Sequence, residues 1–399
     1  MKTFNKMFQG DRVIWVIVML LSISSLLAVY SATGTYANAR YGGNNTYVLM
    51  RHAGTLAIGL VCMYFAHLMK YSYYSRIFQL AFFASIPLLI YTLFFGADLN
   101  DAQRVVHIFG VSFQSSDFAK VALIGYIARE LTLRKNIIKD FKNAFIPLMI
   151  PVLIIVGLIF PENFSTAAIL FACCMIILFV GRINMKHILI FIGIGIVAII
   201  IYMSIMLSRP EEERGRTNTW VNRVENFVES FKKVEDGTTI NYDEEDYQLV
   251  HSKIAIAGGG FFGKTPGKST QRNILPHPYS DFIYAIILEE YGLAGGIFVM
   301  LLYLILLYRV IAILVKMPQS FGGYLAFGLG LLIVMQAMTN MGVAVGVLPV
   351  TGQPLPMISM GGTSLMFTGF ALGVILSVSK EVNKTDIKTD EIELSQSDN

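Results

Sequence analysis

Long apolar runs constrain this chain more than any other feature of its sequence. Since a transmembrane α-helix needs about 20 predominantly apolar residues, the runs predict an all-α polytopic membrane protein and take up roughly half of the chain. Only 15% of the 399 residues are charged, against about 25% in soluble domains. This composition excludes a disordered chain, a disulfide scaffold and a nucleic-acid-binding domain. The nine runs are Val13–Ala32, Ala53–Met69, Ile77–Phe95, Ala144–Phe160, Ser165–Val180, Ile188–Leu207, Phe282–Tyr308, Tyr324–Val347 and Ser364–Val378.

A tenth run, Ser116–Leu133, is weaker because it contains Lys120. Basic residues favour counting it as a span. With ten alternating spans and the N-terminus inside, the cytoplasmic segments carry 17 lysines and arginines, and the short outer loops carry only Arg40, Arg51 and Arg104. Positive charge concentrates on the cytoplasmic side of membrane proteins. The pattern therefore predicts ten spans, with both termini cytoplasmic, in a single transmembrane domain over residues 1–380.

Two segments outside the spans are long enough for a structural prediction of their own: the loop 208–280 and the tail 381–399. A long outer loop, residues 208–280, separates the seventh span from the eighth, and its apolar residues from Trp220 to Phe231 recur with helical spacing. This spacing predicts an amphipathic helix that lies on the membrane or on the protein. Residues 381–399 are charged and almost free of apolar residues, which predicts a disordered cytoplasmic tail.

The glycine-rich segment Gly263–Ser269 superficially resembles a phosphate-binding loop. Three residues separate Gly263 from Gly267, where the motif requires four, and the predicted topology puts the segment outside, away from ATP. We therefore exclude a nucleotide site. Two interpretations remain: a flexible loop, which composition alone favours, or a loop that must approach a ligand or another backbone closely.

Ionisable residues inside predicted spans are the first candidates for functional chemistry, because charge is expensive in a bilayer. Asp117 and Lys120 lie three residues apart on one helical face and can pair, for structure or for function. Glu289 and Glu290 follow the start of the eighth span. Because adjacent helical residues point about 100° apart, we expect at most one of them to face a central cavity.

Asp281 lies where the long outer loop re-enters the membrane, after two prolines, Pro276 and Pro278, that stiffen the approach. A rigid carboxylate at this position can act as a general base or bind a metal ion. The alternative is that Ser280 or Asp281 caps the helix that follows, and spacing alone favours the cap.

The uncharged loop between the last two spans, from Pro349 to Ser364, contains three prolines and three glycines. A broken segment at membrane depth is tolerated only when it is buried in protein or lines a cavity. We therefore expect such a segment here, with backbone amides available to an anion or a lipid headgroup.

Taken together, these segments resemble the signature of the SEDS family, whose name stands for shape, elongation, division and sporulation. The resemblance extends over nearly the whole chain, including the span count and the long outer loop. Gly263–Ser269 is more similar to the division branch, FtsW, than to the elongation branch, RodA. The matching segments are Leu275–Pro276, Ser280–Ala285, Glu289–Gly292, Asn340–Gly342 and Leu348–Ser364, with further similarity at Gly96–Arg104 and Gln114–Lys120.

The resemblance implies a peptidoglycan glycosyltransferase that polymerises lipid II at the outer face of the bacterial cytoplasmic (inner) membrane, at the division septum. It implies a divalent metal ion, Mg²⁺ or Mn²⁺, as cofactor. The implied partners are a class B penicillin-binding protein that crosslinks the new strands, other division proteins and membrane lipid. A lipid II flippase, an elongation-type polymerase and a scaffold without chemistry are the alternatives.

The resemblance also implies roles for individual residues. The essential aspartate of the family falls on Asp281, as general base or metal ligand, and a second motif gives catalytic roles to Asp117 and Lys120. The implied substrate-binding residues are Arg104, Gln114, Ser280, Ser359, Gly361, Gly362, Thr363 and Ser364. The sequence departs from the family pattern at Val105, Ser115, Asp117, His277 and Tyr279.

Overall fold

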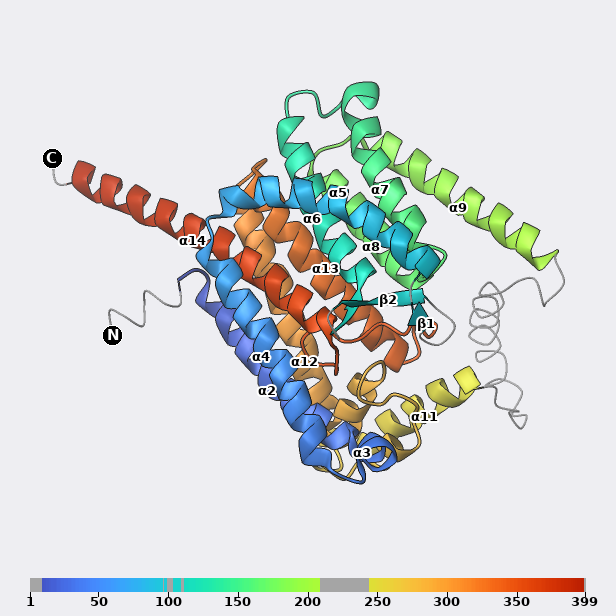
Figure 1. The fold of residues 1–399 in the computed structure, drawn as a ribbon. Helices are drawn as coiled ribbons and strands as arrows, with labels where there is room; N and C mark the ends of the chain where they lie inside the picture. The colour runs from blue at the N-terminus through green and yellow to red at the C-terminus, as the bar shows by residue number, and fades with distance from the viewer. Residues whose placement is uncertain (1–8, 96, 99–102, 109–110, 209–243, 398–399) are drawn as a thin grey trace.

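The computed structural model of the protein describes residues 9–95, 97–98, 103–108, 111–208 and 244–397, and it is a bundle of long helices (Figure 1). The long elements are α2 (Arg12–Ala32), α4 (Asn45–Leu68), α5 (Tyr71–Phe95), α6 (Ser115–Leu133), α7 (Ile146–Ile159), α8 (Phe164–Val180), α9 (Met185–Leu207), α11 (Glu244–Gly259), α12 (Ile283–Lys316), α13 (Phe321–Ala344) and α14 (Thr363–Ser397). The short elements are α3 (Gly34–Tyr41), η1 (Phe141–Phe145), η3 (Gln271–Asn273), β1 (Ala97–Asp98), β2 (Gln103–Ile108) and β3 (Val111–Gln114).

All ten predicted runs fall on helices, and the fold is polytopic. Seven helices of the described part are long and apolar enough to cross a membrane: α2, α4, α5, η1 with α7, α12, α13 and α14 as far as Val382. The helix α8 and the first part of α9 are apolar but shorter. The remaining run forms α6, which carries the buried charges Asp117, Lys120 and Glu130.

The core of the bundle lies around α13, which packs against α12, α6, α14 and α8. In an apolar stretch of 18 residues of α13, 83% of the residues are buried. Beside it, α14 lies along α4, and a Cβ added at Gly369 would approach the Gly59 carbonyl oxygen to 2.2 Å. Small residues permit this close approach of membrane helices.

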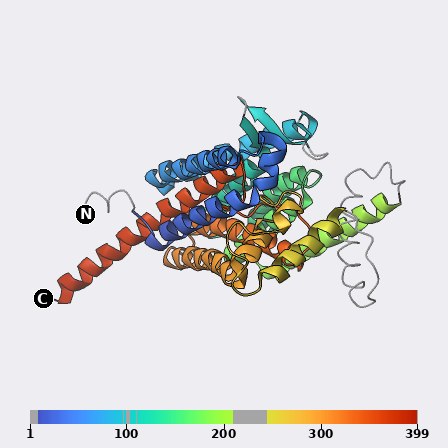
Figure 2. The same ribbon diagram turned by 90° about the horizontal axis from the view of Figure 1, so that it is seen from below.

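Two views show which elements share an end of the bundle (Figures 1 and 2). The start of α2 and the far end of α14 lie at one end. The strands and α11 lie toward the other, where α3 also packs near η3. The candidate functional residues lie toward this second end. The fold therefore brings them together from distant parts of the chain.

The all-α prediction is wrong in one place, because β1, β2 and β3 form a small antiparallel sheet. Val105 pairs with Gln114 and Ile108 pairs with Val111 in the β2–β3 register. Valine and isoleucine favour strands, and this short polar interval between two spans offers no 20-residue apolar run that would favour a helix.

Of the expectations for segments outside the spans, one differs from the structure and one concerns residues outside the described part. The outer loop contains α11, whose residues Leu249, Ser252 and Ala255 are buried at three-residue spacing. The predicted amphipathic helix from Trp220 to Phe231 lies outside the described residues. The segment after Lys380, which we expected to be disordered, is helical to Ser397 as a continuation of α14, because extending an existing helix avoids the cost of nucleation.

Candidate functional site

The loop between α13 and α14 is buried from Leu355 to Ser359 and is held by side chains from several helices. The Ser25 hydroxyl on α2 donates to the Ile358 carbonyl at 2.8 Å, and Tyr303 on α12 donates to the Pro356 carbonyl. From the loop itself, the side-chain amide of Gln353 donates to the Thr166 hydroxyl on α8 at 2.8 Å. This observation confirms the expectation of a broken segment that is buried in protein.

The same loop is joined to the segment that carries Asp281. The Ser359 hydroxyl donates to the Ser280 carbonyl at 2.6 Å, and the Met360 amide donates to the Tyr279 carbonyl at 2.9 Å. On α13, the Asn340 side-chain amide donates to the Asp281 carbonyl at 2.8 Å and to the Gln353 carbonyl at 2.7 Å. Two motifs far apart in the sequence therefore form one hydrogen-bonded unit.

The carboxylate of Asp281 is half-buried within this unit. Its Oδ1 accepts a hydrogen bond from the Ser280 hydroxyl at 2.8 Å. Its Oδ2 lies 3.6 Å from the position that a Cβ on Gly352 would occupy. Helix α12 begins at Ile283 with Phe282 as its N-cap, and no side chain caps it, so the capping interpretation is wrong.

Asp117 and Lys120 on α6 form a buried ion pair with an O–N distance of 2.8 Å. They line a cavity of about 20 Å³ together with Gln336 on α13 and Ser364 on α14. A cavity of this size admits about one water molecule. Gln336 lies one helical turn before Asn340, so α13 carries one residue beside the ion pair and another bonded to Asp281.

An apolar cavity of about 250 Å³ adjoins this polar one. Its lining includes Thr363 and Phe113, and it shares Val121 and Phe367 with the cavity of the ion pair. The structure therefore sets an apolar chamber next to a buried ion pair.

Of the other predicted substrate-binding residues, Thr363 lines the apolar cavity and Ser364 lines the cavity of the ion pair. The backbone amide of Gln114 donates to the Thr363 hydroxyl at 3.3 Å, which joins the end of β3 to the start of α14. Gly361 and Gly362 connect Met360 to α14, and Gly362 is exposed. Arg104 lies in β2, and its side chain falls outside the described part of the chain.

Sequence reasoning assigned no role to Gln336 and Asn340, although both meet the site. Both are buried, at 8% and 1% exposure. The signal that could have found them is the pair of amides four residues apart inside an apolar run, because polar residues within membrane helices ordinarily bond to neighbouring segments.

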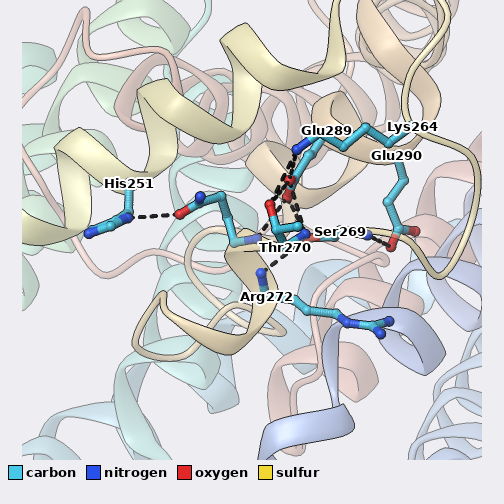
Figure 3. A network of polar contacts seen from close by, with 8 residues as sticks. His251, Lys264, Ser269, Thr270, Arg272, Glu289 and Glu290 are labelled. Atoms are coloured by element: carbon cyan, nitrogen blue, oxygen red, sulfur yellow. Dashed lines mark hydrogen bonds and ion pairs between the residues drawn. The ribbon is translucent and has the colours of Figure 1, made fainter.

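Glu289 and Glu290 do not face a central cavity, because the outer loop covers both of them (Figure 3). Glu289 accepts hydrogen bonds from Lys264 Nζ at 2.8 Å and from the Thr270 amide at 3.0 Å. Glu290 accepts a hydrogen bond from the Ser269 amide at 3.3 Å. Both carboxylates therefore anchor the loop that leads to Asp281.

The glycine-rich segment packs against a break in α12 at Gly292, whose φ is 68°. A Cβ on Gly263 would lie 2.2 Å from the Glu290 carbonyl oxygen. The Lys264 amide donates to the Glu289 carbonyl at 2.9 Å. The flexible-loop interpretation, which composition favoured, is wrong, since these glycines allow two backbones to approach closely.

A metal ion would have a sparse set of protein ligands here. Among the described residues, no group of three or more His, Cys, Asp or Glu side chains could hold one. Mg²⁺ is commonly bound through one or two carboxylates plus substrate phosphates. The half-buried carboxylate of Asp281 fits such a site, in which the substrate supplies the remaining oxygens.

Known proteins match almost the whole chain. The family model described as "Cell cycle protein", for FtsW, RodA and SpoVE, matches residues 11–384. The stage V sporulation protein E of Bacillus subtilis is 29% identical over 94% of this chain and 98% of its own length. A probable peptidoglycan glycosyltransferase FtsW of Aromatoleum aromaticum is 30% identical over 93% of this chain and 88% of its own length.

The fold also matches a solved structure. The matching chain comes from work on the structural coordination of polymerization and crosslinking by a peptidoglycan synthase complex. It has a TM-score of 0.73 and 22% identity, and the match covers 94% of this chain and 98% of that one. At this identity the likeness establishes the polytopic fold.

Proposed function

The chain belongs to the FtsW, RodA and SpoVE family of cell cycle proteins, and on that premise we propose that it is a peptidoglycan glycosyltransferase. Its substrate is lipid II, a disaccharide-peptide carried on undecaprenyl pyrophosphate. The observation that carries the proposal is the arrangement along α13. Gln336 lies beside the Asp117–Lys120 pair, whose cavity adjoins the apolar chamber, and Asn340 is bonded to the main chain of Asp281.

The proposed reaction is a single displacement with inversion. An acceptor hydroxyl oxygen bonds to the anomeric carbon of the donor sugar, and the bond from that carbon to the pyrophosphate oxygen breaks. Asp281 takes the hydroxyl proton as general base, a role that typically contributes about 10²–10⁴-fold in rate. Lys120 and Arg104 offset the charge on the departing undecaprenyl pyrophosphate.

A divalent ion, Mg²⁺ or Mn²⁺, completes the proposed site. Pyrophosphate oxygens would hold it, and Asp281 would be its protein ligand in the alternative to the general-base role; when bound, the ion supplies positive charge to the leaving group. The substrate-binding roles proposed for Gln114, Ser280, Ser359 and the segment 361–364 are supported by their positions around Asp281 and the two cavities.

The proposed topology has ten spans with both termini in the cytoplasm of a bacterial cell, in the inner membrane. It is supported by the 17 basic residues assigned to cytoplasmic segments against three in the short outer loops. It also has support from the fold, since the start of α2 and the end of α14 lie at the same end of the bundle (Figure 2). Asp281 then lies at the outer face, where the polymer is made.

The proposed partner is a class B penicillin-binding protein, with other division proteins at the septum. The solved chain with the same fold was studied as part of a synthase complex that couples polymerization to crosslinking. The names of the FtsW and SpoVE relatives support a septal role in division or sporulation over an elongation role.

The test uses purified protein with its cognate penicillin-binding protein in vesicles, labelled lipid II and Mg²⁺ or Mn²⁺. A β-lactam blocks crosslinking, and glycan polymer is resolved on a gel. We expect polymer from wild type and none from Asp281→Asn of equal thermal stability. Wild-type protein that makes no polymer but moves lipid II across the bilayer would instead establish a flippase.

A further inference from the structure

Four tyrosines form a row on the outer end of the protein, which we call the tyrosine row: Tyr279 from the loop before α12, Tyr36 and Tyr41 from α3, and Tyr47 from the start of α4. The ring centroids of Tyr36 and Tyr279 lie 4.9 Å apart, those of Tyr36 and Tyr41 lie 5.8 Å apart, and those of Tyr41 and Tyr47 lie 4.9 Å apart. Tyr47 is 52% exposed and the other three are half-buried. Each ring therefore has a neighbour on the row and part of its surface open to the outside.

The tyrosine row is held in place by contacts between its segments. The Thr35 hydroxyl at the start of α3 donates to the Asn273 side chain at 2.9 Å, which joins α3 to the loop that leads to Asp281. The Arg51 guanidinium on α4 donates to the Tyr41 hydroxyl at 2.9 Å. A surface that is positioned in this way can bind a ligand with little loss of conformational entropy.

The row starts beside the proposed catalytic carboxylate. Tyr279 precedes Asp281 by two residues, and its carbonyl accepts the hydrogen bond from the Met360 amide. From Tyr279 the row leads away across α3 to the start of α4. A chain of sugars whose reacting end is at Asp281 would therefore find aromatic rings along its length.

The chemistry of the row suits a carbohydrate. A pyranose ring has an apolar face of C–H groups and a rim of hydroxyls, and tyrosine likewise combines an apolar face with a polar tip. A tyrosine hydroxyl is protonated at neutral pH and can donate to a sugar oxygen; burial raises the pKa of Tyr36 further. Arg40 and Arg51 are exposed beside the row and add hydrogen-bond donors.

We propose that the tyrosine row is a binding subsite for the glycan strand, which it holds next to Asp281 between successive additions. This inference rests on the proposed function, since it concerns the polymer of that reaction. Tyrosines also collect at membrane interfaces, where their rings lie at headgroup level. The packing of Tyr36 on Tyr279 favours the glycan. A tyrosine that contacts lipid headgroups has no need to lie next to Asp281, whereas a ring that holds the reacting strand does.

The test separates binding from turnover. The probe is a fluorescently labelled, lipid-free, uncrosslinked peptidoglycan strand, and the protein is the full chain with Asp281→Asn, in nanodiscs. Adding Tyr36→Ala or Tyr41→Ala should raise the dissociation constant for the strand about threefold to tenfold, which is the effect of losing one aromatic contact. Tyr36→Phe should retain most of the affinity. Tyr73→Ala, which removes a tyrosine that is 61% exposed at the start of α5, is the matched control.

A second measurement uses protein that carries the wild-type Asp281. Tyr36→Ala should make shorter glycan strands than Tyr36→Phe, because the growing strand dissociates more often. Unchanged affinity and strand length in both alanine variants, at wild-type thermal stability, would overturn the proposal. So would unchanged glycan affinity together with weaker association with anionic vesicles, which would identify a lipid contact. Strand binding by a wild-type protein that makes no polymer would refute the glycosyltransferase and support this subsite.

Discussion

The Ser359 hydroxyl donates a hydrogen bond to the Ser280 carbonyl oxygen at 2.6 Å, across 79 residues of sequence. The same hydroxyl oxygen accepts a hydrogen bond from the Leu355 amide at 2.7 Å. One side chain thus positions the residue before Asp281 and closes the turn of the broken segment. The carboxylate therefore depends on the loop between α13 and α14 as much as on its own helix.

Removal of this hydroxyl should disturb catalysis more than stability. Ser359→Ala leaves the part-buried Ser280 carbonyl and the buried Leu355 amide without their partner, a loss of about 1–3 kcal/mol. We expect polymer formation to fall about tenfold or more. Ser377→Ala is the control, since that buried hydroxyl also donates to a carbonyl, that of Met69, at the opposite end of the bundle. Equal activity of the two variants would contradict the role of Ser359.

The Asn340 amide offers an isosteric test. Because it donates to two carbonyls, Asn340→Asp turns a donor into an acceptor that faces two other acceptors. We expect a loss of at least about 3 kcal/mol in stability, with no polymer made. Thr339→Ala should change little, because that hydroxyl donates to the Met335 carbonyl of its own helix. Thermal unfolding in detergent and the gel assay measure both effects.

The Asp117–Lys120 pair can be tested for structure and function separately. Lys120→Met alone leaves a buried carboxylate unpaired and should destabilise the protein by about 3–5 kcal/mol. The double variant Asp117→Leu with Lys120→Met removes both charges and should recover most of that stability. If Lys120 offsets leaving-group charge, the double variant still makes no polymer. Polymer formation at the wild-type rate would mean that the pair is purely structural.

His52 is expected to hold the broken segment through Ser25. Since the Ser25 hydroxyl donates to Ile358, it must accept from His52 Nε2, which lies 2.8 Å away. The terminal amide of His52→Gln can replace Nε2, whereas that of His52→Asn corresponds to Nδ1. We expect near wild-type stability and activity for Gln and a loss of about 1–3 kcal/mol for Asn. Equal behaviour of Gln and Asn in thermal unfolding and polymer assays would rule out this role.

The sequence by itself determined the class of this protein. Apolar runs long enough for helices predicted ten helical segments, and every one falls on a helix of the structure. Motif residues identified the family, which the match over residues 11–384 confirms. Burial of the middle of the Pro349–Ser364 loop also followed from its composition, since unpaired backbone at membrane depth must be covered by protein. All of these inferences depend on local properties of the chain.

Only the tertiary structure decided which residues meet. It joined Ser359 to Ser280, and Asn340 to Asp281. It also took Glu289 and Glu290 out of any central cavity by folding the outer loop over them. Such contacts are made between segments tens to hundreds of residues apart, and they depend on how helices pack and where a backbone breaks. Hydropathy and spacing report the environment of a residue along its own segment, and they carry no information about its partner across the bundle.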